Sequence, residues 1–241
     1  TVTISCDNML NAASLHFTPN PMAISELTAT AGENGTATVS WICETSQSDS
    51  QWLVVYSPAG TEDMEIAVQS SESSISLSGL IPGVTYDIEV RTVAGDQVDG
   101  GKGMLIMPDA TVFDDYGFTS AYIGIWLRPN KDDWTAANLQ IVKDSFSKTE
   151  KIAFACESIN TPQDSTDTVM TMIVVRDNSG ALVDYYTGQE VWSNMWSKHG
   201  GKYLYIGELL RTPQTPGDYT FEIYFNGQLV NSGAPNKFTI K

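Results

Sequence analysis

The stretch Leu77-Ser78-Gly79-Leu80-Ile81-Pro82-Gly83-Val84-Thr85-Tyr86 decides the fold prediction. Pro82 and Gly83 favour a turn, because proline presets φ and glycine accepts positive φ. The segment Thr85–Thr92 then alternates between apolar and polar residues, which is typical of a half-buried β-strand. Tyr86, Ile88 and Val90 point one way in this strand, and Asp87, Glu89 and Arg91 point the other.

Short alternating segments separated by Gly, Ser and Asp also precede this stretch. They are Thr36–Ile42, Trp52–Tyr56, Glu65–Gln69 and Ser74–Ser78. Short strands at this spacing predict a β-sandwich. Residues 1–20 are either the tail of an upstream module or an extra edge strand.

Three features together resemble a fibronectin type III module: Trp41 in an early strand, Tyr56 in the next, and the run from Leu77 to Tyr86. The resemblance implies that Trp41, Tyr56, Leu80 and Tyr86 are buried and that Tyr86 forms a tyrosine corner. The resemblance covers about residues 21–108. Val84 departs from the family, which often has Thr at this position. The chain contains no Arg-Gly-Asp, so integrin binding through that motif is not expected.

The composition changes near residue 110, which predicts a second module at residues 111–241. Residues 1–110 hold 14 acidic and two basic residues, whereas residues 111–241 hold 15 acidic and 11 basic residues and 19 of the 24 aromatic residues. Met107-Pro108-Asp109-Ala110 is interpreted as the linker, because Pro ends strands and Asp favours turns. The net charge of −16 argues against binding to nucleic acid or anionic membranes. The longest apolar runs, Tyr122–Leu127 and Met172–Val175, have the length of strands and are too short to span a membrane.

The second module is also predicted to be β. Its expected strands are Ala121–Leu127, Leu139–Val142, Lys151–Cys156, Val169–Arg176, Ala181–Tyr186, Tyr203–Leu210, Tyr219–Phe225, Gln228–Asn231 and Lys237–Ile240. Asp177-Asn178-Ser179-Gly180 and Asn226-Gly227 predict hairpin turns, since Asn and Gly accept positive φ. The run from Pro216-Gly217-Asp218-Tyr219 to Phe238-Thr239-Ile240 loosely resembles the last strands of an immunoglobulin-like surface domain. The chain is therefore expected to be all-β, with two sandwiches in tandem.

No residue pattern in the chain predicts catalysis, a metal site or a cofactor. His16 and His199 have no nucleophile motif around them and are interpreted as lone surface histidines. Gly100-Gly101-Lys102-Gly103 lacks the spacing of a phosphate loop and is interpreted as a flexible hairpin tip. Asp114-Asp115 and Asp132-Asp133 are interpreted as solvated turns in preference to calcium ligands. The cysteines Cys43 and Cys156 are expected to be buried thiols, and a Cys6–Cys43 bridge is the alternative for that pair.

An aromatic cluster is the remaining candidate site. Its residues are Tyr185, Trp192, Trp196 and Tyr203, close to Tyr186 and Tyr205. Exposed rings flanked by polar groups bind the faces of sugars. The favoured interpretation is that Trp192 and Trp196 are core residues, because Val191, Trp192, Met195 and Trp196 would form a buried stripe on a short helix. The glycan-binding interpretation predicts that both rings are exposed.

The sequence therefore predicts a non-catalytic extracellular or cell-surface module of a larger bacterial protein, acting in adhesion, spacing or glycan contact. High Ser/Thr, low Lys and few Cys favour this setting. The alternative is a pair of accessory domains of an extracellular polysaccharide-degrading enzyme. The chain starts at Thr1 without Met, so we expect a processed product or an excised piece. The expected partner is a glycan or another surface protein, without nucleic acid or membrane insertion, and the expected state is a monomer.

Overall fold

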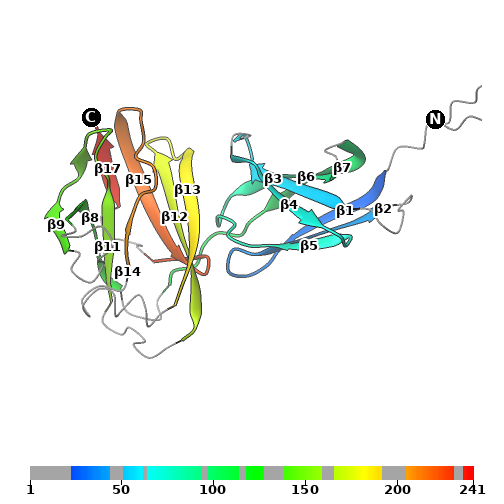
Figure 1. Ribbon diagram of the computed structural model, residues 1–241, viewed down its shortest axis with the longest axis horizontal. Helices are drawn as coiled ribbons and strands as arrows, with labels where there is room; N and C mark the ends of the chain where they lie inside the picture. Colours follow the sequence, from blue (N-terminus) through cyan, green and yellow to red (C-terminus); the bar gives the residue numbers. More distant parts are fainter. Residues whose placement is uncertain are drawn as a thin grey trace, which may run out of the picture. The chain divides into compact units, whose positions relative to one another are not determined.

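The structure is a computed structural model that describes residues 23–43, 51–61, 64–93, 97–113, 118–127, 138–158, 166–191, 205–230 and 236–241. In these ranges the regular elements are β-strands, and no helix is long and apolar enough to cross a membrane. The chain divides into two compact units (Figure 1). The first contains Ala37–Leu77, Val84–Ile106 and the chain up to Ala31, and the second contains Gly32–Thr36, Ser78–Gly83 and Met107–Lys241.

The strands of the first unit form two antiparallel sheets. One sheet has the order β1-β2-β5 and the other the order β4-β3-β6-β7. The strand bounds are β1 Ile24–Ala31, β2 Ala37–Cys43, β3 Trp52–Pro58, β4 Ile66–Ser70, β5 Ser74–Leu77, β6 Thr85–Thr92 and β7 Gln97–Ile106. The five strands expected from alternation therefore all exist, and β6 has the predicted bounds.

Aromatic side chains join the two sheets of this sandwich. Trp41 on β2 and Trp52 on β3 pack edge to face, with ring centroids 5.8 Å apart. Within one sheet, Tyr56 on β3 and Tyr86 on β6 lie 6.2 Å apart between their ring centroids. The four residues expected to be buried, Trp41, Tyr56, Leu80 and Tyr86, are 3%, 6%, 1% and 0% exposed, which confirms the prediction.

The prediction of a flexible hairpin tip at residues 100–103 is wrong, because these residues lie inside β7. Gly100 has a φ of 73°, and a Cβ added there would lie 2.1 Å from the carbonyl oxygen of Ile24. The register between β6 and β7 shifts between Glu89 and Arg91 at the same place. Glycine is needed here because the irregular strand passes close to the β1 backbone. A local run of glycines is also typical of turns, so the sequence pattern alone does not distinguish the two cases.

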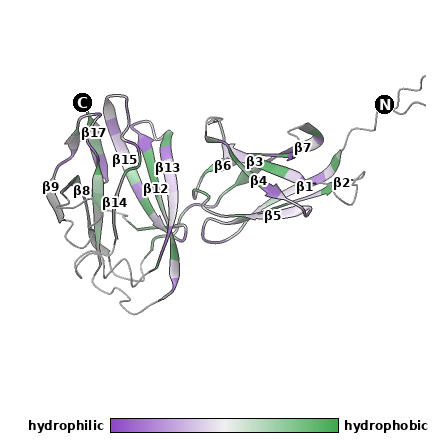
Figure 2. Cartoon of the chain, viewed as in Figure 1, coloured by the Kyte–Doolittle hydropathy of each residue, from purple (hydrophilic) through white to green (hydrophobic). Residues whose placement is uncertain are grey.

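The second unit contains a larger sandwich. One sheet has the order β10-β17-β15-β12-β13, with β16 paired to β15, and the other has the order β14-β11-β8-β9. The bounds are β8 Phe118–Leu127, β9 Asn138–Val142, β10 Ser145–Phe146, β11 Ala153–Ser158, β12 Thr168–Asp177, β13 Leu182–Val191, β14 Tyr205–Glu208, β15 Gly217–Phe225, β16 Gln228–Leu229 and β17 Lys237–Ile240. Hydrophobic residues recur along the strands of both units, with hydrophilic residues between them (Figure 2).

Side chains from both sheets of the second unit meet in one core. Ile123 and Phe154 come from the smaller sheet, and Ile173, Phe221 and Phe225 come from the larger one. The strand predicted at Tyr219–Phe225 exists within β15, and its alternate residues Tyr219, Phe221, Ile223 and Phe225 all belong to the core. The fold class predicted from the sequence, two all-β sandwiches in tandem, is therefore the observed one.

The hairpin turns are where the sequence placed them. Asn226 and Gly227 have φ values of 47° and 75° and connect β15 to β16. Asp177-Asn178-Ser179-Gly180 connects β12 to β13, with Gly180 at a φ of 85° and a hydrogen bond from Asp177 N to Ala181 O of 3.0 Å. Asn178 is not among the residues with positive φ, so glycine alone supplies that conformation in this turn.

The second unit also departs from the prediction. The short strand β10 was not anticipated, and β11 begins at Ala153 where the sequence indicated Lys151. Tyr224, whose side chain alternates away from those of Tyr219 and Phe221, is nevertheless only 4% exposed, and it donates its hydroxyl to Glu222 Oε2 at 2.9 Å. The proposed linker lies outside any strand, but it is anchored: Met107 is buried, and Pro108 O accepts a hydrogen bond from Gly83 N at 2.8 Å. The boundaries 21–108 and 111–241 stay predictions.

Candidate functional site

The outward side of β7 carries two exposed apolar residues. Met104 is 68% exposed and Ile106 is 71% exposed, while Leu105 and Met107 beside them are buried at 2% and 3%. Successive side chains of a strand point to opposite faces, so Met104 and Ile106 share the solvent side of the sheet. That side normally carries polar residues in an antiparallel sandwich, so an apolar pair there is a candidate contact surface.

The sheet register shows which residues surround this pair. On β6, Thr85 lies opposite Ile106, Asp87 opposite Met104, and Glu89 opposite Lys102. On β3, Ser57, Val55 and Leu53 lie opposite Asp87, Glu89 and Arg91. We call the outward residues of these three strands the β7 face. They are Leu53, Val55, Ser57, Thr85, Asp87, Glu89, Arg91, Lys102, Met104 and Ile106.

Charged side chains form ion pairs at the centre of the β7 face. Arg91 Nη2 lies 2.6 Å from Glu89 Oε2 and 3.8 Å from Glu65 Oε2, and Lys102 Nζ lies 3.9 Å from Glu89 Oε1. The hydrogen bond to Glu89 raises the pKa of the Arg91 guanidinium above its ordinary value. Val55 is 4% exposed although it points outward. Arg91 and Lys102 therefore both pair with Glu89, so the charges in this part of the face largely neutralise one another.

Asp87 differs from Glu89. It is exposed, and none of the basic groups in the described part of the chain forms an ion pair with it. Arg91 and Lys102 are the two basic residues of positions 1–110, and both are engaged by Glu89. The β7 face thus presents an exposed carboxylate directly across from an exposed methionine.

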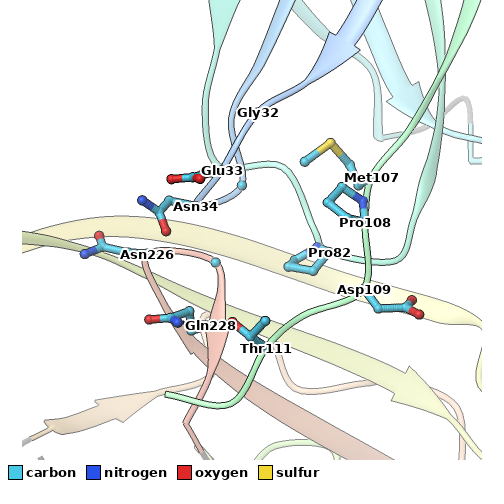
Figure 3. A pocket seen from close by; sticks show the side chains of 12 residues that line it. Gly32, Glu33, Asn34, Pro82, Met107, Pro108, Asp109, Thr111, Asn226 and Gln228 are labelled. Atoms are coloured by element: carbon cyan, nitrogen blue, oxygen red, sulfur yellow. Dashed lines mark hydrogen bonds between the residues drawn. The ribbon is translucent and has the colours of Figure 1, made fainter. Parts of the chain in front are cut away.

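A pocket of about 380 Å³ lies in the second unit, and Figure 3 shows its lining. Glu33 and Asn34 come from the turn after β1, where Asn34 and Gly35 have φ values of 58° and 69°. Pro82, Met107 and Pro108 contribute apolar surface, and Asp109, Thr111, Asn226 and Gln228 contribute polar groups. Gln228 Nε2 lies 3.1 Å from Thr111 Oγ1. The lining combines amide and carboxylate groups with proline and methionine.

The aromatic candidate site falls mostly outside the described residues. Trp192, Trp196 and Tyr203 lie there, so their exposure stays a prediction. Tyr185 is half-buried on β13 and pairs in register with Val174, on the side of the sheet away from the core. The neighbouring Tyr186 packs against the core.

Of the other residues singled out in the sequence, some lie outside the described residues and some lie within them. His16, His199, Asp114-Asp115, Asp132-Asp133 and Cys6 lie outside the described residues, and so does any Cys6–Cys43 bridge. Cys156 is 1% exposed, and its burial raises the pKa of the thiol to about 12. Cys43 is half-buried. In the ranges that the structure describes, no group of three or more His, Cys, Asp or Glu residues could hold a metal ion.

Sequence reasoning missed the β7 face, because the glycines before it indicated a turn. The signal was the run Met104-Leu105-Ile106-Met107. Apolar residues at four successive positions of a strand cannot all face one core, so two of them must point outward. The same run in a sheet covered on both faces would be buried on both sides, and the alternation alone does not show whether the outer face of this sheet is covered.

Comparison with known proteins gives one family. The model of the fibronectin type III domain matches residues 22–100. The search of curated proteins found no match. Among solved structures, the fn3 domain of human contactin 1 is 19% identical, with 45% of this chain and 95% of that chain covered and a TM-score of 0.34.

Two further solved structures are similar at the same level. The fn3 domain of human collagen alpha-1(XX) chain is 24% identical, with 41% and 96% of the two chains covered and a TM-score of 0.32. The FN1-FN3 domains of chicken CNTN1 are 11% identical, with 95% and 70% covered and a TM-score of 0.31. The family model and the observed seven-stranded sandwich, with Trp41, Tyr56 and Tyr86 in its core, agree. The chain carries a fibronectin type III domain at residues 22–100, followed by a second β-sandwich.

Proposed function

We propose that this chain is a non-catalytic extracellular module that contacts another protein through the β7 face of its fibronectin type III domain. Domains of this family commonly act as non-catalytic binding or spacer modules. The observation that carries the proposal is the exposure of Met104 and Ile106, at 68% and 71%. Leaving two large apolar side chains in water forgoes the free energy that their burial would provide, and a partner that covers them recovers it.

The setting that fits this function is a larger surface or secreted protein, and a bacterial one on the grounds of composition. The acidic balance and the small number of cysteines support an extracellular place, and fibronectin type III domains are typical of extracellular proteins. In such a protein the module contributes to adhesion. The alternative, a spacer beside a polysaccharide-degrading enzyme, requires no contact at the β7 face.

Site-specific photo-cross-linking tests the proposal. A photoreactive amino acid at position 104 is expected to give a defined adduct when the full-length protein is produced in its own cells. The matched control is position 42, because Ile42 is 55% exposed on the opposite sheet of the same domain. No adduct at 104, or equal adducts at both positions, would contradict a specific contact. Turnover assays with ester, peptide and glycoside substrates should show no activity for the chain alone.

Glycan contact is a second candidate function, and the pocket of the second unit favours it. Amide and carboxylate groups from Asn226, Gln228 and Asp109 beside Pro108 and Met107 match the mixture of hydrogen-bonding and apolar groups that orients a sugar. A glycan array with the wild type, Gln228→Ala and Trp192→Ala tests both this pocket and the aromatic cluster. Gln69→Ala, at an exposed position on β4, is the control. An array without hits would remove glycan contact from the account.

A further inference from the structure

We infer that the partner of the β7 face presents a lysine or arginine side chain to Asp87, with aliphatic side chains beside it that cover Met104 and Ile106. This inference rests on the proposed function and adds the chemistry of the partner. It follows from three properties of the face: the position of Asp87, the charge of the domain, and the spacing of the two apolar residues.

Asp87 is positioned to bind a cation from outside the domain. Glu89, two residues along β6, is already contacted by Arg91 and Lys102, and Glu65 is contacted by Arg91. No basic group in the described residues contacts Asp87, and it lies opposite Met104 in the register. Directly opposed residues have Cβ atoms about 5 Å apart. A lysine or arginine bound to Asp87 would lay its methylene stem along Met104, as these side chains do when only the charged end stays in water.

The charge of the domain argues against a second copy as the occupant. Residues 1–110 carry 14 acidic and two basic residues, and the whole chain has a net charge of −16. Two copies brought face to face would repel each other, whereas a cationic segment would be attracted from a distance. A bare divalent ion is also a poor fit, because it needs several oxygen ligands and Asp87 offers one carboxylate beside a methionine.

Met104 and Ile106 define the apolar part of the contact. Residues two apart on one side of a strand are separated by about 6.7 Å. An extended partner segment has the same spacing between its alternate side chains, so two aliphatic residues at positions i and i+2 match the pair. A basic residue two positions beyond the one that covers Met104 would stay on the same side, and its long side chain would reach across to β6 to meet Asp87, which lies opposite Met104.

The test is an NMR titration of the full chain with three capped peptides. The cationic apolar peptide is Lys-Ser-Val-Ser-Val-Ser, the anionic one is Glu-Ser-Val-Ser-Val-Ser, and the cationic polar one is Lys-Ser-Ser-Ser-Ser-Ser. The first should shift amide resonances of β6 and β7 and bind at least about threefold more tightly than either of the others. Equal binding of the three peptides, no binding of the first, or shifts confined to other strands would overturn the inference.

Matched variants separate this site from general attraction to an acidic protein. Asp87→Asn should weaken binding of the cationic apolar peptide about three- to fivefold, the effect of losing one exposed ion pair. Glu72→Gln removes an equal charge at an exposed turn and should leave binding unchanged. Met104→Ser should weaken it, whereas Ile42→Ser should not. Equal effects of Asp87→Asn and Glu72→Gln would overturn the inference.

The peptide and cross-linking experiments can fail independently. Adducts at position 104 without binding of the cationic peptide would leave the face as a protein contact with a partner of other chemistry. Peptide binding at β6 and β7 without cellular adducts would show that the face recognises a cationic apolar segment, and it would contradict the proposal that the face contacts a protein in the cell.

Discussion

Tyr219 donates its phenolic hydroxyl to the backbone carbonyl of Thr215, with 2.6 Å between the oxygens. Its ring is buried at the start of β15 and stacks on Phe238, with the ring centroids 5.5 Å apart. The contact has the form of a tyrosine corner, in which a core ring reaches back to the chain upstream. The second sandwich therefore contains the device that the sequence led us to expect at Tyr86 in the first.

Removing this hydroxyl should weaken the second sandwich. Tyr219→Phe keeps the ring and deletes one hydrogen bond, so the free energy of unfolding should fall by about 1 kcal/mol. Urea denaturation followed by the fluorescence of the second unit measures the change. An unchanged midpoint would show that the hydrogen bond does not help to hold the corner.

Trp41 should be a main support of the fibronectin type III domain. It is 3% exposed and packs on Trp52, and its Nε1 atom has no hydrogen-bond partner. Trp41→Ala should cost about 3–5 kcal/mol, the range for truncating a large buried aromatic residue. Trp41→Phe should cost clearly less than Trp41→Ala, because the remaining ring leaves a much smaller cavity. A near-neutral Trp41→Ala variant in thermal unfolding would contradict the packing described.

Two glycines with positive φ allow the cost of backbone strain to be distinguished from the cost of a steric clash. Gly60 has a φ of 80° and nothing within 4 Å of an added Cβ, whereas an added Cβ at Gly100, with a φ of 73°, lies 2.1 Å from Ile24 O. Gly60→Ala should cost about 1 kcal/mol from backbone strain alone. Gly100→Ala should cost at least about twice as much, since a backbone carbonyl cannot easily move away. Equal melting temperatures for the two variants would mean that β7 does not pass β1 this closely.

Cys156 should be chemically inert in the folded protein. It is 1% exposed, and burial raises its thiol pKa to about 12, so almost no thiolate forms near neutral pH. Iodoacetamide at pH 8 should leave Cys156 unmodified in native protein and modify it in denaturant, as read by mass spectrometry of the peptides. Rapid labelling of the native protein would place this thiol at the surface.

Strands and turns with strong local patterns could be predicted from the sequence. Tyr219–Phe225 alternates cleanly because one side of β15 faces the core, and Asn226-Gly227 adopts the left-handed backbone that a tight hairpin needs. Tyr224 shows where alternation stops being informative. On the outer side of a sheet, neighbouring side chains bury one another, and Tyr224 lies against Glu222 instead of pointing into water.

The candidate site could not be predicted, because it depends on contacts between distant segments. Gly100 and Gly103 look like a turn in the sequence, and only the passage of β1 beside them gives a reason for glycine in a strand. Whether Met104 is buried depends on whether another element covers the outer face of this sheet, and Met104 is 68% exposed. Among the described residues no basic group pairs with Asp87, because Arg91 and Lys102 both pair with Glu89, and no local pattern encodes this.

The free energy of unfolding of the double variant Met104→Ser/Ile106→Ser tests most directly whether the β7 face is a contact surface. If these side chains point into water and await a partner, the variant should stay within about 0.5 kcal/mol of the wild type, as surface substitutions do. Leu105→Ala, at the buried position between them, should lose about 2–5 kcal/mol in the same experiment. A loss above about 2 kcal/mol for the double variant would show that Met104 and Ile106 stabilise the fold itself, and would contradict the account.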